Sequence, residues 1–531
     1  MRENVFQKIH YLKVGIFFLI TSGVLFWQKK LLFNIVSNIT FQWHDIIEIT
    51  LGGLLFIFFG YFLYLKKNEY KLRGGMLSQE NQEKLFQALL YFVVVSIFFL
   101  LAIKIFFSSF DFIPLYFYGI MVTFILFINF FVALFKYEDL AIVAKDKELK
   151  DKEENKFKKN PLVSCMVAVW NEEKDIERCI LSLTNQTYRN KEIIFVNDGS
   201  VDGTAKILDK YAKQGLIKVI HQKNSGKKRA LGNAMRRARG TIFAFSDSDS
   251  TWAPDALEKI VPILKHYPKV GAVSGHFRLQ NSADNFLTRV QDSWAEGQFS
   301  IRKAFESYFG SVTCVSGPLA VFRKESIYNY IPAWEQDTFL GQEFRFATDR
   351  TLTGYLLGSK FIGKKVRKKY YDSSFNYNLE YKDRNWKIVY SKSARSWTIL
   401  PNTWKKLFRQ QIRWKKSFIR NTFFTGRFYW RKPFWPALVY YSHIVFVIGG
   451  PIITFRHLVY LPAGGNILSA VLYITGIVFV GLMFGLVYKI DNRNCHIWVY
   501  RPFMSLLSTL VLSWLIFYSV LTIKKMVWYR G

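Results

Sequence analysis

The chain has 531 residues, half of them hydrophobic, and its 73 Lys+Arg against 39 Asp+Glu give a formal net charge of +34. A chain of this length is too long to fold around a single hydrophobic core, so two or more structural regions are expected. Because the composition is both strongly apolar and rich in charge, we expect apolar blocks that alternate with soluble ones. A net positive charge of this size is typical of proteins that bind nucleic acid, anionic lipid or an anionic substrate. In a membrane protein with basic loops, anionic lipid alone is enough to explain it.

Several windows of about 20 residues carry almost no charge, and this length crosses the hydrocarbon layer as a helix. The first window is not a cleavable signal, because it lacks a small-residue cleavage site and a second window follows soon. The sequence therefore predicts about four transmembrane helices in 1–140 and three or four in 431–531. The windows lie near 9–27, 45–65, 86–107, 112–136, 435–456, 467–488 and 500–523.

Basic residues favour the cytoplasmic side of a membrane, and they are dense at 66–73 and at 145–160. We therefore expect a multi-pass plasma-membrane protein whose middle region is cytoplasmic. Three C-terminal helices would leave Lys524 and Lys525 outside, so either a short or re-entrant segment lies around 437–465 or the charge rule fails here. The four cysteines show no paired short spacing and are expected to be free thiols.

In the middle region, short apolar strands alternate with helical stretches, which predicts a doubly wound α/β sheet. The first strand, PLVSCMVAV, is continuously apolar, as expected where both faces of a parallel sheet are covered. The expected strands are 161–169, 191–197, 216–221 and 241–247, and the expected helices are 171–186, 198–215 and 226–240.

Polar residues follow these strands, and in such sheets ligands collect at the carboxyl ends of the strands. Asp198 follows the second strand, while Asp247 and Asp249 end the fourth. Two carboxylates with one residue between them can share Mg²⁺ or Mn²⁺ and its bound phosphates, although a lone D-x-D is otherwise a solvated turn. The basic run that begins at Lys227 would hold a diphosphate. The chain has no G-x-x-x-x-G-K-[ST] loop, so the metal must carry more of the phosphate binding.

Two further segments carry polar residues. In SGPLAVFRKE a turn at Gly317 and Pro318 precedes an apolar strand, and further on Asp349 begins a helix, where the plain role of a carboxylate is an N-terminal cap. The stretch 407–421 predicts an amphipathic basic helix along the membrane surface. That role leaves three of its residues unexplained: Gln410, Arg413 and Trp414.

Together these motifs resemble the membrane-embedded glycosyltransferases of family 2, the group of the cellulose, chitin and hyaluronan synthases. The resemblance covers about 160–425, with VNDGSVDGT, NSGKKRALGNA, SDSDS, SGPLAVFRKE, TFLG with TDRTLT, and QQIRW in the family's order. The hyaluronan synthases and the chitin-oligosaccharide synthases of nodulating bacteria are the most similar members. Two features depart from the hyaluronan synthases: Ala347 and Thr348 replace a Gly-Asp pair, and four apparent N-terminal spans exceed the usual two.

The resemblance implies a GT-A type domain with a mixed, mostly parallel sheet at 145–400, inserted between transmembrane helices, and amphipathic interfacial helices at 401–430. It implies a UDP-sugar donor and a Mg²⁺ or Mn²⁺ cofactor. The donor residues would be Asp198 at the uracil-ribose end, Lys227 and Arg413 at the phosphates, and Asp247, while Asp249 would hold the metal with Asp247.

The resemblance also implies the acceptor side. Asp349 would be the general base that deprotonates the acceptor hydroxyl, while the departing UDP needs positive charge. No second carboxylate is evident beside Asp349, so single displacement with inversion is expected. The residues expected to border the acceptor and its channel are Trp414, Gln410, Gly317 and Pro318.

These observations favour a processive synthase that polymerises UDP-GlcNAc, alone or alternating with UDP-GlcA, into a β-linked, hyaluronan-like polysaccharide and secretes it through its own channel. One alternative is a membrane glycosyltransferase that adds a single sugar to a lipid or short acceptor. Another is a non-enzymatic nucleotide-sugar sensor, which the retained carboxylates oppose. Growing polysaccharide and membrane lipids are the expected partners; nucleic acid would explain the charge but neither the carboxylates nor the spans. The sequence leaves the oligomeric state open.

Overall fold

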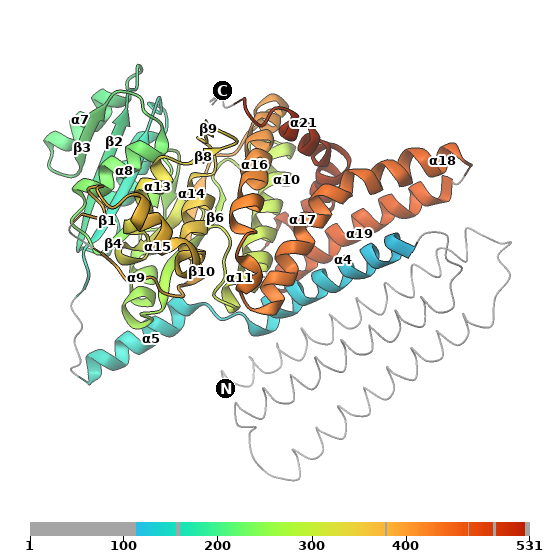
Figure 1. The fold of residues 1–531 in the computed structure, drawn as a ribbon, viewed down its shortest axis with the longest axis horizontal. Coiled ribbons are helices and arrows are strands. Elements are labelled where there is room, and N and C mark those ends of the chain that lie inside the picture. Colours follow the sequence, from blue (N-terminus) through green and yellow to red (C-terminus); the bar gives the residue numbers. More distant parts are fainter. Residues whose placement is uncertain (1–112, 155–159, 378–379, 466, 492–494, 526–531) are drawn as a thin grey trace, which may run out of the picture. The chain divides into compact units, whose positions relative to one another are not determined.

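The computed structural model describes residues 113–154, 160–377, 380–465, 467–491 and 495–525. The chain divides into two compact units, Met1–Phe124 and Ile125–Gly531. The second contains an eight-stranded sheet in the order β3-β2-β1-β4-β7-β6-β10-β5 (Figure 1). Its strands are β1 (Val163–Val169), β2 (Lys191–Asp198), β3 (Lys218–Gln222), β4 (Ile242–Ser246), β5 (Thr251–Trp252), β6 (Val270–Leu279), β7 (Ala320–Arg323) and β10 (Lys387–Thr398).

The first four strands are parallel, as their alternation with helices predicts. The chain winds outward from β1 to β2 and β3 and then returns to the other side of β1 to form β4. All seven residues of β1 are buried, because helices cover both faces of this part of the sheet. The direction of winding therefore reverses between β1 and β4, the place where open α/β sheets bind ligands.

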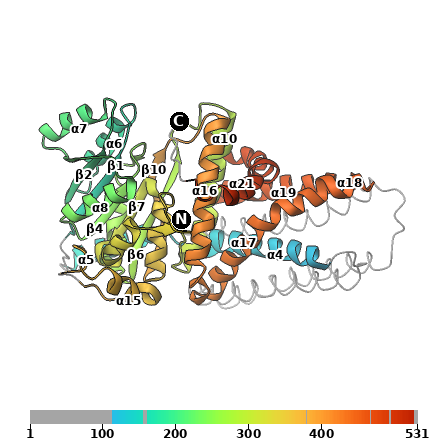
Figure 2. The ribbon, with the colours of Figure 1, turned by 45° about the horizontal axis from the view of Figure 1, so that its top comes forward.

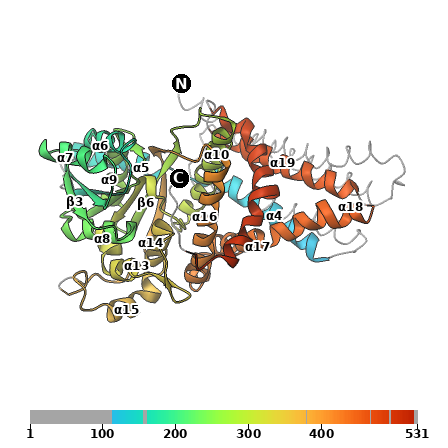
Figure 3. The same cartoon turned by 90° about the horizontal axis from the view of Figure 1, so that it is seen from above.

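Helices cover the two faces unequally (Figure 3). On one face α6 (Ile176–Thr184), α7 (Thr204–Lys213) and α9 (Ala256–His266) share a core with alternate residues of β1. On the other face α8 (Lys227–Arg237) packs on β1 and β2. The first residue of α8 thus lies close to the carboxyl edge of the sheet.

The other half of the sheet is mixed, so the doubly wound pattern holds only for the first four strands. β7 runs antiparallel to both β4 and β6, and β10 runs antiparallel to β5. Because Ala320 pairs with Phe245, the start of β7 lies at the carboxyl end of β4. The turn before β7 consequently enters the edge of the sheet that carries Asp247.

Three helices connect this sheet to the apolar C-terminal part: α10 (Phe286–Gly297), α14 (Thr348–Leu357) and α16 (Trp404–Thr425). α10 and α16 lie side by side (Figure 2), and both join one apolar cluster with the residues Met504 and Leu512. Three helical runs in the described part of the chain are long and apolar enough to cross a membrane, namely Phe434–Ala463, Ser469–Lys489 and Ile497–Leu521.

These three runs coincide with the three predicted C-terminal windows. The region 437–465, where an additional segment was considered, is one continuous helical run as far as Ala463. The fourth N-terminal window corresponds to α4 (Ile113–Phe131), and the first three lie outside the described residues. The charged linker begins as a helix, α5 (Leu140–Glu153). All four cysteines are free, as expected.

Helix α16, which covers the stretch predicted to lie along the membrane surface, is attached to the end of the last apolar run. Lys416 is buried, and its Nζ donates to Thr522 O at 2.5 Å and to Lys525 O at 2.7 Å. Thr522 directly follows α21 (Leu515–Leu521), and its carbonyl group also accepts from Lys525 N at 2.9 Å. A lysine at this position therefore serves as a cap supplied from another element.

Candidate active site

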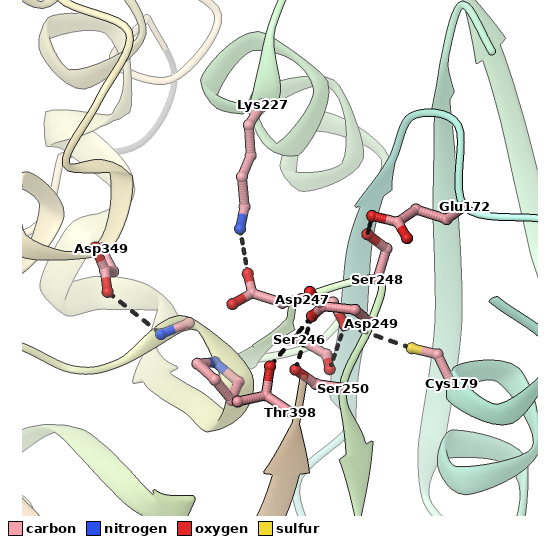
Figure 4. Close-up of polar contacts among 12 residues, drawn as sticks. Glu172, Cys179, Lys227, Ser246, Asp247, Ser248, Asp249, Ser250, Asp349 and Thr398 are labelled. Carbon is pink, nitrogen blue, oxygen red and sulfur yellow. Dashed lines mark hydrogen bonds and ion pairs between the residues drawn. The ribbon is translucent and has the colours of Figure 1, made fainter. Parts of the chain in front are cut away.

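The two carboxylates predicted at a strand end lie where the winding of the sheet reverses. Asp247 and Asp249 follow β4 directly, next to the carboxyl end of β1 (Figure 4). Lys227, the first residue of α8, points toward them, and its Nζ forms an ion pair with Asp247 Oδ1. Behind them, the Cys179 thiol donates to the backbone oxygen of Asp247 at 3.6 Å. The structure thus brings Lys227 and Asp247 together.

Hydroxyl groups hold Asp249 in place. Its Oδ1 accepts from Ser250 Oγ at 3.2 Å and from Thr398 Oγ1, at the end of β10, at 3.3 Å. The described part of the chain holds no group of three or more His, Cys, Asp and Glu side chains suited to a metal. Mg²⁺ or Mn²⁺ is nevertheless often bound by only one or two protein carboxylates when substrate phosphates supply further oxygen ligands. Asp247 and Asp249 therefore fit a phosphate-bound cation.

Asp198, at the end of β2, is buried and holds the loop before α8. Its Oδ1 accepts from Ser225 N and Gln222 Nε2, both at 2.8 Å, and its Oδ2 accepts from Gly226 N at 2.8 Å. Gly226 has a φ of 90°, which strongly favours glycine. The contacts give Asp198 a role in placing Lys227, and its contact with a nucleotide stays a prediction.

Gly317 lies between Asp247, the predicted donor carboxylate, and Asp349, the predicted base. A Cβ on Gly317 would lie 2.7 Å from Asp247 Oδ2 and 2.8 Å from Oδ1, so a side chain here would displace the carboxylate or the turn. On its other side, the N–H of Gly317 donates to Asp349 Oδ2 at 3.4 Å (Figure 4). Trp252 Nε1 fixes the turn by donating to Pro318 O at 2.6 Å. One backbone segment therefore sets the spacing between Asp247 and Asp349.

Asp349 is the second residue of α14 and does not act as its cap. The cap is Ala347, which has a φ of 62° and makes no side-chain cap hydrogen bond. Asp349 Oδ1 accepts from Arg350 N at 2.9 Å, and the Cys314 thiol lies 3.5 Å from Oδ2. Burial raises the pKa of Cys314 to about 11, so at neutral pH the thiol is a donor. Asp349 is thus oriented by donors and only partly buried.

Comparison with known proteins identifies this part of the chain. Residues 164–331 match the family model described as Glycosyl transferase family 2. The chain carries a family 2 glycosyltransferase domain. The resemblance seen in the motifs is confirmed, and the mixed, mostly parallel sheet of this glycosyltransferase is of GT-A type. The family match ends before Asp349 and before the interfacial helix.

Individual relatives extend the similarity further. A hyaluronan synthase of Streptococcus pyogenes serotype M3 is 27% identical over 390 residues, which cover 70% of this glycosyltransferase and 84% of that chain. An N-acetylglucosaminyltransferase of Rhizobium leguminosarum bv. viciae is 30% identical over 267 residues, covering 49% and 57%. A solved mannosyltransferase from Pyrobaculum calidifontis, in complex with GDP-Man and Mn²⁺, is 19% identical with a TM-score of 0.42, covering 73% and 99%.

A buried lysine, Lys303, contacts the residue that precedes the Gly317 turn of the glycosyltransferase. Lys303 Nζ donates to Ser316 Oγ at 2.6 Å and to Ser274 Oγ at 2.8 Å, and it lies 4.0 Å from the centre of the Phe299 ring. Burial lowers the pKa of Lys303 to about 8. Lys303 could not be predicted from the sequence, because a lysine within an ordinary helical stretch gives no local signal of burial.

Two of the predicted acceptor residues, Gln410 and Trp414, lie on α16. Trp414 stacks on Trp294 of α10, with ring centres 5.3 Å apart and planes at 23°. From the sequence alone, Trp294 would be taken as a core residue. In the structure it packs against Trp414, the residue predicted to stack on the acceptor sugar. Gln410 is buried, and its Oε1 has no hydrogen-bond partner among the described residues. The roles of Gln410, Arg413 and Trp414 toward substrate stay predictions.

Proposed function

We propose that the protein is a processive, inverting glycosyltransferase that polymerises UDP-activated sugars into a β-linked polysaccharide. The donors are UDP-GlcNAc alone, or UDP-GlcNAc and UDP-GlcA in alternation as in hyaluronan. The observation that carries the proposal is the placement of Gly317, whose backbone separates the donor carboxylate Asp247 from the base Asp349. The similarity to a protein named hyaluronan synthase supports the choice of donors.

In the proposed reaction Asp349 takes the proton of the acceptor hydroxyl while that oxygen attacks the anomeric carbon of the donor. The bond from the anomeric carbon to UDP breaks, and its electron pair leaves on the diphosphate. Lys227 and Arg413 stabilise the charge that develops there. Because Asp349 acts as base and no second carboxylate takes the part of a nucleophile, displacement occurs once and inverts the anomeric centre.

Asp247 and Asp249 would hold Mg²⁺ or Mn²⁺ together with the donor diphosphate. The cation supplies Lewis-acid stabilisation of the leaving group when bound. The protein's own part is to orient the two carboxylates. Ser250 and Thr398 do this for Asp249, and Lys227 does it for Asp247.

The acceptor would extend from Asp349 past the interfacial helix at 401–430 toward the apolar helices. Trp414 offers a flat ring on which a sugar can stack. Gln410 Oε1 is a buried oxygen that can accept a hydrogen bond from a sugar hydroxyl. Gly317 and Pro318 border the same path. In this proposal the glycosyltransferase domain at 145–400 faces the cytoplasm of a multi-pass plasma-membrane protein, membrane lipids surround its spans, and the polymer leaves through the protein's own helices.

The proposal is tested by UDP release from the purified, detergent-solubilised protein with Mg²⁺ or Mn²⁺. UDP-GlcNAc, UDP-GlcA and both together are offered. Sustained release that needs both donors and gives a product that hyaluronidase digests identifies a hyaluronan synthase, whereas sustained release with UDP-GlcNAc alone identifies a chitin-like synthase. Chelation of the metal is expected to stop release in either case. No polymer with any combination overturns the proposal and favours transfer of one sugar to a lipid.

A further inference from the structure

One buried carboxylate ties together two helices that carry predicted site residues. Asp337 precedes a hairpin formed by β8 (Thr338–Phe339) and β9 (Gln342–Glu343). Asp337 Oδ2 accepts from Lys228 Nζ at 2.8 Å, and its Oδ1 pairs with Arg420 Nη2. The three side chains are only 2–7% exposed. In the fold the hairpin lies between α8 and α16 (Figure 1).

On the donor side, the hairpin holds the first turn of α8. Lys228 directly follows Lys227, the proposed diphosphate contact, and its Nζ also donates to Phe344 O at 2.8 Å. The next residue, Arg229, pairs with Glu343 at 3.3 Å. Two successive residues after Lys227 are therefore fixed by the same short segment.

On the acceptor side, the hairpin holds α16. Arg420 lies on this helix, and one turn further Phe423 packs against Phe339 of the hairpin with ring centres 5.8 Å apart. Helix α14, which begins with the proposed base, approaches α16 so closely that a Cβ on Gly354 would lie 2.9 Å from the Phe424 ring. α16 is thus attached to both the donor helix and the base helix.

We propose that Asp337 is a positioning residue that fixes the donor end of the active site relative to the acceptor end. The inference rests on the proposed function, because it takes Lys227 as the donor contact and α16 as the acceptor side. Without Asp337, Lys228 and Arg420 are two buried cations that repel each other, and the helices that carry them separate. A shift on the order of 1 Å between reacting groups can lower a rate by about 100-fold.

The decisive measurement is the ratio of sugar transferred into product to UDP released, in wild type and Asp337→Asn. Asparagine keeps the shape of the side chain but removes its charge. Because α8 stays packed on β1 and β2, UDP affinity is expected to change by no more than about twofold, while the transfer ratio falls by about tenfold as water replaces a misplaced acceptor. Lys228→Met is expected to lower the ratio in the same way.

Asp292→Asn is the matched control, because Asp292 is buried and pairs with Arg278 Nε at 2.9 Å and Nη2 at 2.7 Å, yet joins neither α8 nor α16 to the hairpin. It is expected to lower stability and leave the ratio unchanged. Equal loss of transfer and UDP release in Asp337→Asn, or the same fall of the ratio in Asp292→Asn, would overturn the positioning role.

Hydrogen exchange separates this inference from the proposed function, since it needs no turnover. Asp337→Asn is expected to speed amide exchange in both the first turn of α8 and the last two turns of α16, and Asp292→Asn in neither. If wild type makes no polymer but this paired change occurs, the proposed function fails while the link between the helices stands. If exchange is unchanged in either helix, Asp337 is not a positioning residue.

Discussion

At the scale of single residues, the backbone at Gly317 packs closely against the Asp247 carboxylate. Gly317→Ala introduces a methyl group where the Asp247 carboxylate lies 2.7–2.8 Å away, so the turn or the carboxylate must move. We expect UDP release to fall by about 100-fold, as for other small misplacements of reacting groups. The thermal midpoint is expected to change little, because Gly317 does not have a positive φ.

Gly476→Ala is the control for this substitution. Among the residues that the structure describes, a Cβ there meets nothing within 4 Å, and the residue lies inside α19 (Ile467–Asp491), so its effect should stay within about twofold. Full activity of Gly317→Ala would show that the working enzyme does not keep this close approach.

Asp349→Asn tests the base. The amide oxygen can still accept from Gly317 N, but the side chain can no longer take a proton from an acceptor hydroxyl. Transfer is expected to fall by about 100-fold or more, the usual share of a general base. UDP affinity, measured by calorimetry, is expected to stay as in wild type. Persistent turnover would remove Asp349 from the role of base.

At the scale of elements, the pairing of α10 with α16 places one tryptophan behind another. Trp294→Ala removes the ring that supports Trp414, although Trp294 itself belongs to no predicted motif. A supported ring holds a sugar better than a mobile one, because stacking on sugar requires a fixed plane. We therefore expect shorter polymer at an unchanged initial rate of UDP release, measured by gel filtration of product. Equal polymer length in Trp294→Ala and wild type would contradict this support.

The parallel strands and their ends could be predicted from the sequence, because each strand is a continuous apolar run followed by polar residues. β7 could not be assigned a direction, since its four residues carry no pattern that distinguishes parallel from antiparallel pairing. Lys303 and Asp337 gave no signal for a related reason. Lys228 and Asp337 are 109 residues apart, and no local pattern encodes a contact at that separation.

The ion pair between α8 and the hairpin depends on pH. Burial lowers the pKa of Lys228 from 10.5 to about 8; Asp337 and Glu343 oppose the shift, and Arg420 adds to it. Between these two values the unfolded chain binds more protons than the folded protein, so the contribution of Lys228 to stability rises with pH in that window. Lys228→Met lacks this titration.

The midpoint of wild type minus that of Lys228→Met is therefore expected to increase by a few degrees between about pH 7.5 and pH 9.5. Thermal unfolding in detergent at several pH values measures this difference. A difference that stays constant or falls over this range would mean that Lys228 does not titrate there. Lys405→Met, at an exposed lysine, provides the baseline.

At the scale of the whole molecule, Lys416 joins the interfacial helix to the end of the last apolar run. Lys416→Met removes this donor from the carbonyl groups of the half-buried Thr522 and the exposed Lys525, and a hydrogen bond contributes about 0.5–1.5 kcal/mol. We expect a lower thermal midpoint and a faster loss of activity in detergent than in wild type. Similar behaviour of Lys416→Met and the exposed Lys405→Met would contradict the capping role.

The same contact also orders the events of synthesis on the ribosome. Lys416 is made 106 residues before Thr522 and 109 before Lys525. At about 5–20 residues per second, α16 waits roughly 5–20 s for its anchor. The sheet is complete by then, so we expect the predicted donor residues of a nascent chain to be in place before α16 is anchored. If this anchor is needed for transfer, full activity is expected only after residue 525 has emerged, so that translation itself delays the first turnover.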